Sequence, residues 1–276
     1  MRSDPAMAAR TTARLARAGC VAAPDEAADL TAAAPTPAVL ETWLRRREAG
    51  EPLAWIVGQV RFCGHVLAID PGVYVPRFQT EDLARRAASL LPSRGRALDL
   101  CTGAGAVAVH LQRAVPSAAV IGVERDLVAA GCAGGNGVTV VIDDLGASIG
   151  VVGAGGMFDV VTAVAPYVPT DALHLLPRDT LRYEPRAALD GGADGLDVIR
   201  RVIARAGEVL RPGGWLLIEV GGDQDRPVAP LLRAAGFGEV AAHRDGEGDL
   251  RFVAARADGY RKRQHDASLW PGDPLR

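Results

Sequence analysis

From Arg96 onward the chain alternates short apolar runs with segments of helical character, and this alternation limits the possible folds more than any other feature. Five runs have the length and composition of strands: RALDL (96–100), AAVIGVE (118–124), GVTVVID (137–143), FDVVTAV (158–164) and GGWLLIEV (213–220). The alternation predicts an α/β fold with a Rossmann-like, mostly parallel sheet and helices on both faces. The segment GEVAAHRDGEGDLRFVAAR (238–256) predicts a terminal hairpin, which leaves one strand of the sheet antiparallel.

Before this region the pattern changes twice. Residues 1–50 are rich in Ala, Arg and Leu and predict a small N-terminal helical region. Residues 51–78 mix β-branched, aromatic and polar residues with Gly and Pro, which predicts a β-hairpin connector. We therefore expect a ligand-binding α/β domain over 79–258 and a loose tail over 259–276.

Composition argues against several classes of function. The net charge is −2, from 31 basic and 33 acidic residues, so no overall attraction to nucleic acid is expected. No apolar run reaches the roughly 18 residues of a membrane span, and the first residues lack the apolar core of a secretory signal. The four cysteines form no CxxC pair and no two histidines are spaced i, i+4, so neither a metal site nor a disulfide framework is expected. These features predict a cytoplasmic protein that acts without membrane, metal or direct nucleic-acid contact.

A glycine-rich turn follows the first predicted strand. Gly103 and Gly105, in DLCTGAGAVAV (99–109), let the backbone turn sharply and let a ligand approach it closely. Glu124 ends the second predicted strand, where a carboxylate can accept hydrogen bonds from both hydroxyls of a ribose. The glycine spacing also fits a dinucleotide-binding turn, and such a turn can instead serve only the packing of a helix on a strand.

Acidic residues after two of the predicted strands favour S-adenosylmethionine over a nicotinamide cofactor. Asp99 lies near the end of the first predicted strand, where it can meet the amino end of a methionine moiety. Asp143 and Asp144 follow the third strand, where an acid can bond an adenine amino group. Each of these aspartates could instead be a turn or N-cap residue.

Four segments together carry a family resemblance: EPLAWIVGQVRF (51–62), VPRFQTE (75–81), LDLCTGAGAVAV (98–109) and LRYEPRAALDGGADGLDVIRRV (181–202). They resemble segments of the class I, S-adenosylmethionine-dependent methyltransferases that modify a glutamine side-chain nitrogen (N5) in peptide-release factors. The last segment is the longest and the most specific. The resemblance implies a class I methyltransferase sheet, S-adenosylmethionine as cofactor, and a protein substrate that docks on the N-terminal region.

The resemblance also implies a role for each site residue. Cys101, Thr102, Gly103, Ala104 and Gly105 would line the methionine and sulfonium part of the cofactor, with Glu124 on the ribose, and Asp144 and Leu145 at the adenine. Val164, Ala165, Pro166 and Tyr167 stand in the place of the family's Asn-Pro-Pro-Tyr signature, which receives the substrate glutamine.

Val164 is the main departure from the family pattern. In the signature, the Asn side-chain oxygen and the next backbone carbonyl accept the hydrogens of the substrate amide. Val164 cannot accept a hydrogen bond, whereas the carbonyl of Ala165 still can. Losing one positioned polar group costs on the order of 10²–10³ in rate.

Three hypotheses follow from the sequence. The first is an N-methyltransferase of the glutamine type. The second is an impaired or non-catalytic paralogue that binds the cofactor or a partner, or a methyltransferase with a changed acceptor. The third, a nicotinamide oxidoreductase, is disfavoured by Asp99 and by the Pro-Tyr loop. Arg182 and Glu184 are expected to form a buried pair, or else to contact the substrate.

Overall fold

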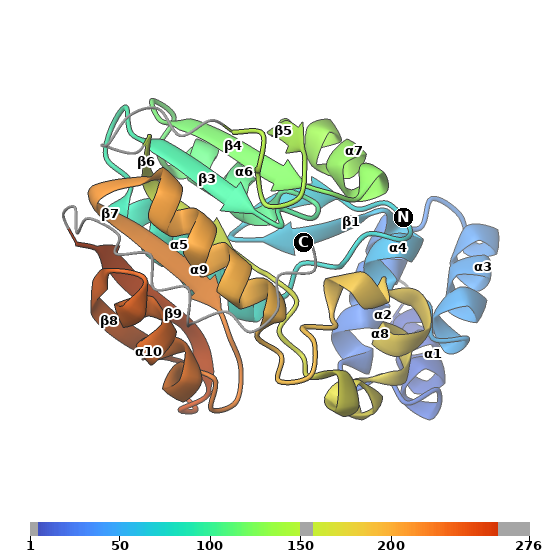
Figure 1. Cartoon of the computed structure of the whole chain (residues 1–276). Coiled ribbons are helices and arrows are strands. Elements are labelled where there is room, and N and C mark those ends of the chain that lie inside the picture. The colour runs from blue at the N-terminus through green and yellow to red at the C-terminus, as the bar shows by residue number, and fades with distance from the viewer. Residues whose placement is uncertain (1–4, 150–156, 259–276) are drawn as a thin grey trace.

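Helices form the N-terminal part of the molecule in the computed structural model, which describes residues 5–149 and 157–258 (Figure 1). They are α1 (Pro5–Arg17), α2 (Ala23–Ala33), α3 (Pro37–Glu48) and α4 (Leu53–Val57). Their shared core is small and is built mainly from Leu15, Leu30, Leu40, Leu44 and Ile56. The predicted tail, 259–276, lies outside the described residues.

The connector begins as a helix, although its β-branched and aromatic composition predicts a strand there. Trp55 and Ile56 are buried, and the indole nitrogen of Trp55 donates a hydrogen bond to the carbonyl of Val73 at 2.9 Å. Tertiary packing of α4 therefore overrides the local β preference. The hairpin follows as β1 (Gln59–Phe62) and β2 (His65–Ala68). The boundaries drawn at residues 50 and 78 stay predictions.

A seven-stranded sheet carries the rest of the described chain, in the order β5-β4-β3-β6-β7-β9-β8. Its strands are β3 (Arg96–Leu100), β4 (Ala119–Glu124), β5 (Thr139–Ile142), β6 (Phe158–Ala163), β7 (Leu210–Glu219), β8 (Phe237–Arg244) and β9 (Leu250–Ala257). Neighbours from β5 to β7 pair in parallel, and β9 runs antiparallel to both β7 and β8. The predicted fold class, including the one antiparallel strand, is confirmed.

Helices cover both faces of the sheet, as the alternation predicts (Figure 1). One face packs against α5 (Glu81–Leu90), α6 (Ala106–Ala114) and α7 (Leu127–Gly135). The other packs against α9 (Asp197–Val209) and α10 (Asp225–Ala234). Strand β6 is buried along its whole length because both of its faces are covered. None of the described helices is long and apolar enough to cross a membrane.

The chain order places a topological switch between β3 and β6. From β3 the chain moves outward to β4 and β5, and it then returns to β6 on the other side of β3. Ligands of open α/β sheets bind outside the carboxyl ends of the strands at such a point. The segments that follow Leu100 and Ala163 therefore border the expected site.

A buried ion pair ties the connector to the segment after the sheet switch. The carboxylate of Glu184 accepts a hydrogen bond from the backbone N–H of Val75 at 3.1 Å and is paired with the guanidinium of Arg77. The expected pairing of Glu184 with Arg182 is wrong. Arg182 is exposed and lies over the ring of Tyr183 at 5.5 Å. Glu184 precedes Pro185 at the end of α8 (Arg178–Tyr183), which turns its side chain toward the connector instead.

We expect Glu184→Gln to lower the free energy of unfolding by about 2 kcal/mol. This is less than the roughly 3–5 kcal/mol for a fully buried pair, because the Arg77 side chain is 34% exposed. Urea titration of both proteins measures the difference. Arg182→Gln is the matched control and should change stability by less than about 0.5 kcal/mol. An equal loss in the two variants would contradict the assignment of the pair.

Candidate active site

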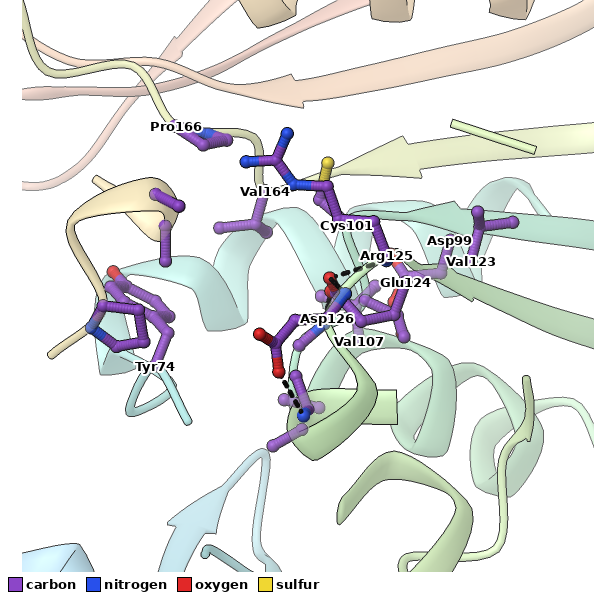
Figure 2. A pocket seen from close by; sticks show the side chains of 18 of the residues that line it. Tyr74, Asp99, Cys101, Val107, Val123, Glu124, Arg125, Asp126, Val164 and Pro166 are labelled. Atoms are coloured by element: carbon purple, nitrogen blue, oxygen red, sulfur yellow. Dashed lines mark hydrogen bonds between the residues drawn. The ribbon is translucent and has the colours of Figure 1, made fainter. Parts of the chain in front are cut away.

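A cavity of about 390 Å³ opens at the carboxyl ends of β3, β4, β5 and β6 (Figure 2). Eleven of the residues named from the sequence line it: Asp99, Cys101, Thr102, Gly103, Ala104, Glu124, Asp143, Asp144, Leu145, Val164 and Pro166. In the view of Figure 2, Tyr74 and Pro166 lie on one side and Glu124 and Asp99 on the other, with Val164 between them. Four strand ends thus gather their side chains around one volume of ligand size.

Three of the named residues do not line this cavity. Gly105 has φ +82°, and a Cβ there would lie 2.7 Å from Val138, so this glycine permits close packing of the turn on its neighbours. Ala165 and Tyr167 line a second, more open cavity. Tyr74, Val164 and Ala188 border both cavities, so the two volumes meet at these three residues.

Glu124 organises the turn after β3 from the end of β4. One of its carboxylate oxygens accepts a hydrogen bond from the backbone N–H of Gly103 at 2.9 Å. The other accepts from the N–H groups of Arg125 and Asp126, at 2.8 and 3.0 Å. The oxygen that binds Gly103 keeps a further lone pair, so the carboxylate can also accept from a ribose hydroxyl.

Asp99 is a buried acid at the floor of the cavity. It is 1% exposed and accepts hydrogen bonds from the hydroxyls of Thr102 and Thr162, at 2.6 and 2.7 Å. Burial raises the pKa of Asp99 to about 6, against the opposing effect of these two hydrogen bonds. A charge kept in such a place costs stability, which is typical of a functional group.

Asp143, Asp144 and Leu145, which follow β5, line the part of the cavity where the sequence predicts an adenine. Asp143 accepts hydrogen bonds from the backbone N–H groups of Asp144 and Ser148, at 2.6 and 2.5 Å, as a turn residue does. The carboxylate of Asp144 is paired with Arg201 of α9 at 2.6 Å, and about half of its side chain is exposed. Asp144 is therefore held in place while its remaining lone pairs face the solvent-accessible rim.

Cys101 occupies a left-handed backbone position, with φ +55°. Burial raises the pKa of its thiol to about 12, with further contributions from Glu124 and Asp99. The side chain is therefore a neutral thiol near pH 7 and has no role as a thiolate nucleophile.

The loop 164–167 is held mainly through its backbone. The side-chain amide of Gln224 donates a hydrogen bond to the carbonyl of Tyr167 at 2.8 Å. A Cβ on Gly195 would lie 2.4 Å from that carbonyl oxygen, and one on Gly191 would lie 2.8 Å from the carbonyl oxygen of Pro166. Within the described residues, the carbonyl of Ala165 accepts no hydrogen bond, so it is free to bind a donor.

Several lining residues were not named as site residues from the sequence. Those from the connector and its extension are Phe62, Gly72, Tyr74, Pro76 and Thr80, and those from the 181–202 segment are Pro185, Ala187, Ala188, Val198 and Arg201. They lie in or beside segments that carry the family resemblance. That resemblance is the sequence signal from which these residues could have been predicted as site residues. The periodicity of the strands could not predict them, because their contacts in the cavity join distant parts of the chain.

Comparisons with known proteins agree with this geometry. No protein-family profile matches the chain. The release factor glutamine methyltransferase of Geobacter sulfurreducens is 37% identical over 217 residues, covering 76% of this chain and 75% of the relative. The chain belongs to the release factor glutamine methyltransferase family.

A second relative carries a different name. The 4-amino-L-phenylalanine/4-methylamino-L-phenylalanine methyltransferase of Streptomyces pristinaespiralis is 36% identical over 261 residues, covering 90% of this chain and 88% of the relative. Among solved structures, the T. thermophilus 16S rRNA N2 G1207 methyltransferase in complex with AdoMet and guanosine has a TM-score of 0.51. It is 21% identical and covers 72% of this chain and 44% of that chain, which shows the likeness of fold.

This family member is a methyltransferase whose cofactor is S-adenosylmethionine, and the cavity fits that molecule. Glu124 offers a carboxylate where the ribose of a nucleoside is expected, and Asp99 offers buried negative charge where a cationic amino group is expected. A sulfonium cofactor supplies an electrophilic methyl carbon. Glu124 and Asp99 would hold the two ends of the molecule in this cavity.

We expect Glu124→Gln to weaken binding of S-adenosylmethionine about 10- to 100-fold. Hydrogen bonds to a charged group are worth roughly 1.5–3 kcal/mol each, and tenfold in affinity corresponds to about 1.4 kcal/mol. Isothermal titration calorimetry measures the dissociation constant. Glu239→Gln, on an exposed side chain of β8, is the matched control and should bind as the parent does. Unchanged affinity in Glu124→Gln would remove this residue from the site.

We expect Asp99→Asn to stabilise the protein at pH 7 and to weaken cofactor binding. The folded-state pKa of about 6 lies above the usual unfolded value of about 3.9, so the folded state binds more protons between these values. The free energy of unfolding of the parent therefore falls by on the order of 2–3 kcal/mol as pH rises through this window. The variant carries no charge at this position, so it does not lose this stability.

Denaturant titrations at pH 4 and pH 7 test this expectation. The free energy of unfolding of Asp99→Asn should be higher than that of the parent at pH 7 and equal to it near pH 4. Asp29→Asn, an exposed change in α2, should have the same free energy of unfolding as the parent at both pH values. A variant that is less stable than the parent at pH 7 would contradict the proposed cost of the buried charge.

Proposed function

We propose that this chain methylates the side-chain amide nitrogen of a glutamine in a protein, such as a peptide-release factor, in the cytoplasm. The observation that carries the proposal is the free carbonyl of Ala165 beside Val164, where the cofactor cavity meets the second cavity. The names of the relatives point to the same substrate. The protein acts without membrane or direct nucleic-acid contact.

An amide nitrogen is a weak nucleophile because its lone pair is delocalised into the carbonyl. The carbonyl of Ala165 can accept one hydrogen of the amide NH₂ and so hold the nitrogen in line with the methyl group. The nitrogen lone pair forms the new N–C bond as the C–S bond breaks, and its electrons stay on sulfur. The nitrogen then releases its proton to water.

The second cavity suits a protein substrate because several separate segments line it. Glu26 and Arg47 come from α2 and α3, Cys20 from the turn between α1 and α2, and Asp179 and Tyr183 from α8. The predicted substrate-docking role of residues 1–50 is part of this proposal. A glutamine side chain would cross this cavity to reach Ala165.

A second candidate acceptor is the ring amine of a free aromatic amino acid. The relative from Streptomyces pristinaespiralis, named for such a substrate, covers 90% of this chain. The apolar side chain of Val164 and the ring of Tyr74 would contact an aromatic ring without leaving a polar group unpaired. This candidate corresponds to the changed acceptor considered above. Nothing in the site favours a non-catalytic paralogue or a nicotinamide oxidoreductase.

We expect labelled S-adenosylmethionine to transfer its methyl group to release factors of the same cell, with the label on a glutamine. Mass spectrometry of the factor after incubation locates the added methyl group. 4-Amino-L-phenylalanine is offered in a parallel reaction, and label on that amine alone would replace the first acceptor by the second. Transfer to neither acceptor, with the cofactor bound, would refute both. Glu124→Gln is the control for transfer that depends on the bound cofactor.

A further inference from the structure

A buried carboxylate borders the second cavity without a cation beside it. Glu219, at the end of β7, is 5% exposed, and its Oε2 accepts a hydrogen bond from the hydroxyl of Thr80 at 2.5 Å. Among the described residues Glu219 forms no ion pair, and Arg77 of the same cavity pairs with Glu184 instead. Burial raises the pKa of Glu219, because its charged form loses hydration that no cation replaces. Such a carboxylate suits a positive charge that comes from outside the chain.

Glu219 lies at the boundary between the second cavity and the cofactor cavity. Thr80, whose hydroxyl holds the carboxylate, lines the cofactor cavity. Glu219 itself lines the second cavity and not the cofactor cavity. The hydrogen bond between the two side chains therefore crosses from one cavity to the other. A ligand that binds Glu219 would lie outside the cofactor cavity and next to it.

A guanidinium group belongs to the same turn as Thr80. The backbone N–H of Thr80 donates a hydrogen bond to the carbonyl of Arg77 at 3.1 Å. The guanidinium carbon of Arg77 lies over the ring of Tyr74, 4.9 Å from its centroid, and that ring borders both cavities. Arg77 binds Glu184 through Nη2. A guanidinium has five N–H donors, so others remain for an anion in the second cavity.

We propose that the second cavity binds a free aromatic α-amino acid as a zwitterion, with its ammonium group on Glu219 and its carboxylate on Arg77. The aromatic ring would contact Tyr74 and Val164 where the two cavities meet, and a ring amine would face the cofactor cavity. A residue inside a protein has neither charge, because its nitrogen and its carbonyl carbon are in peptide bonds. The two charges therefore select a free amino acid. The inference rests on the proposed function, of whose second acceptor it names the recognising groups.

Binding of three related probes tests this assignment. 4-Amino-L-phenylalanine carries both charges, 3-(4-aminophenyl)propanoate lacks the ammonium group, and 4-(2-aminoethyl)aniline lacks the carboxylate. Isothermal titration calorimetry measures the dissociation constant of each with the full chain and S-adenosylhomocysteine, which has no methyl group to transfer. We expect the first probe to bind about 10- to 100-fold more tightly than either of the others, because each truncated probe leaves one charged contact unmade.

Two variants connect each charge of the ligand with its residue. In Glu219→Gln, the advantage of the first probe over the propanoate should fall below about threefold, and affinity for the propanoate should stay as in the parent. In Arg77→Gln, the advantage over the aniline should fall in the same way. Loss of the pair with Glu184 would instead weaken all three probes equally. Glu239→Gln, on an exposed glutamate of β8 that pairs with Arg256, is the matched control and should bind as the parent does.

Equal affinity for the three probes, no binding of any of them, or an ammonium advantage that persists in Glu219→Gln would overturn the inference. It would also be overturned by a release factor whose KM rises in Glu219→Gln while no amino acid binds, because the carboxylate would then meet a cation of a protein. These results are distinct from those that decide the proposed function. Binding of the first probe without methyl transfer to any acceptor would refute the proposed function and leave the charged site in place. Transfer to glutamine without binding of the amino acid would do the reverse.

Discussion

The pairing of Glu184 with Arg77 and with the N–H of Val75 holds the site together. The strand ends supply only one wall of the space in which methyl transfer takes place. The opposite wall is the extended chain that carries Tyr74 and Pro76, and an extended chain has no internal hydrogen bonds to fix its course. A carboxylate delivered from a distant part of the sequence gives this chain its position. This buried contact acts together with the hydrogen bond from Trp55 to the carbonyl of Val73, which fixes the same chain from its other side.

Much of the fold could be predicted because it follows from local patterns. The alternation of apolar runs and helical segments predicted a mostly parallel sheet, and the terminal hairpin predicted the antiparallel strand β9. The helix at Leu53–Val57 could not be read in this way, because burial of Trp55 and Ile56 decided its conformation. The partner of Glu184 was missed for the same reason. Sequence proximity favoured Arg182, whereas the direction of the chain after α8 favoured Arg77.

The residues of the site also divide into those that local sequence patterns predict and those that they do not. Residues that follow strands were identifiable, since parallel strands bring their carboxyl ends to one edge. Glu124 and Asp99 lie there, and both line the cavity. Gly105 was also identifiable as a special position, but its contact with Val138 gives it a packing role. Tyr74 could not be found from the strand pattern alone, because its neighbours in the cavity come from other parts of the chain.

The loop 164–167 takes its course from residues outside it. Gly191 and Gly195 lie against its carbonyls, and Gln224 binds one of them, so the backbone path does not depend on the side chain at position 164. A substitution there can change which molecule is accepted and leave the scaffold intact. Such a loop lets new acceptors arise by single replacements, with the cofactor half of the reaction untouched. In this fold, substrate choice can therefore evolve separately from the machinery that delivers the methyl group.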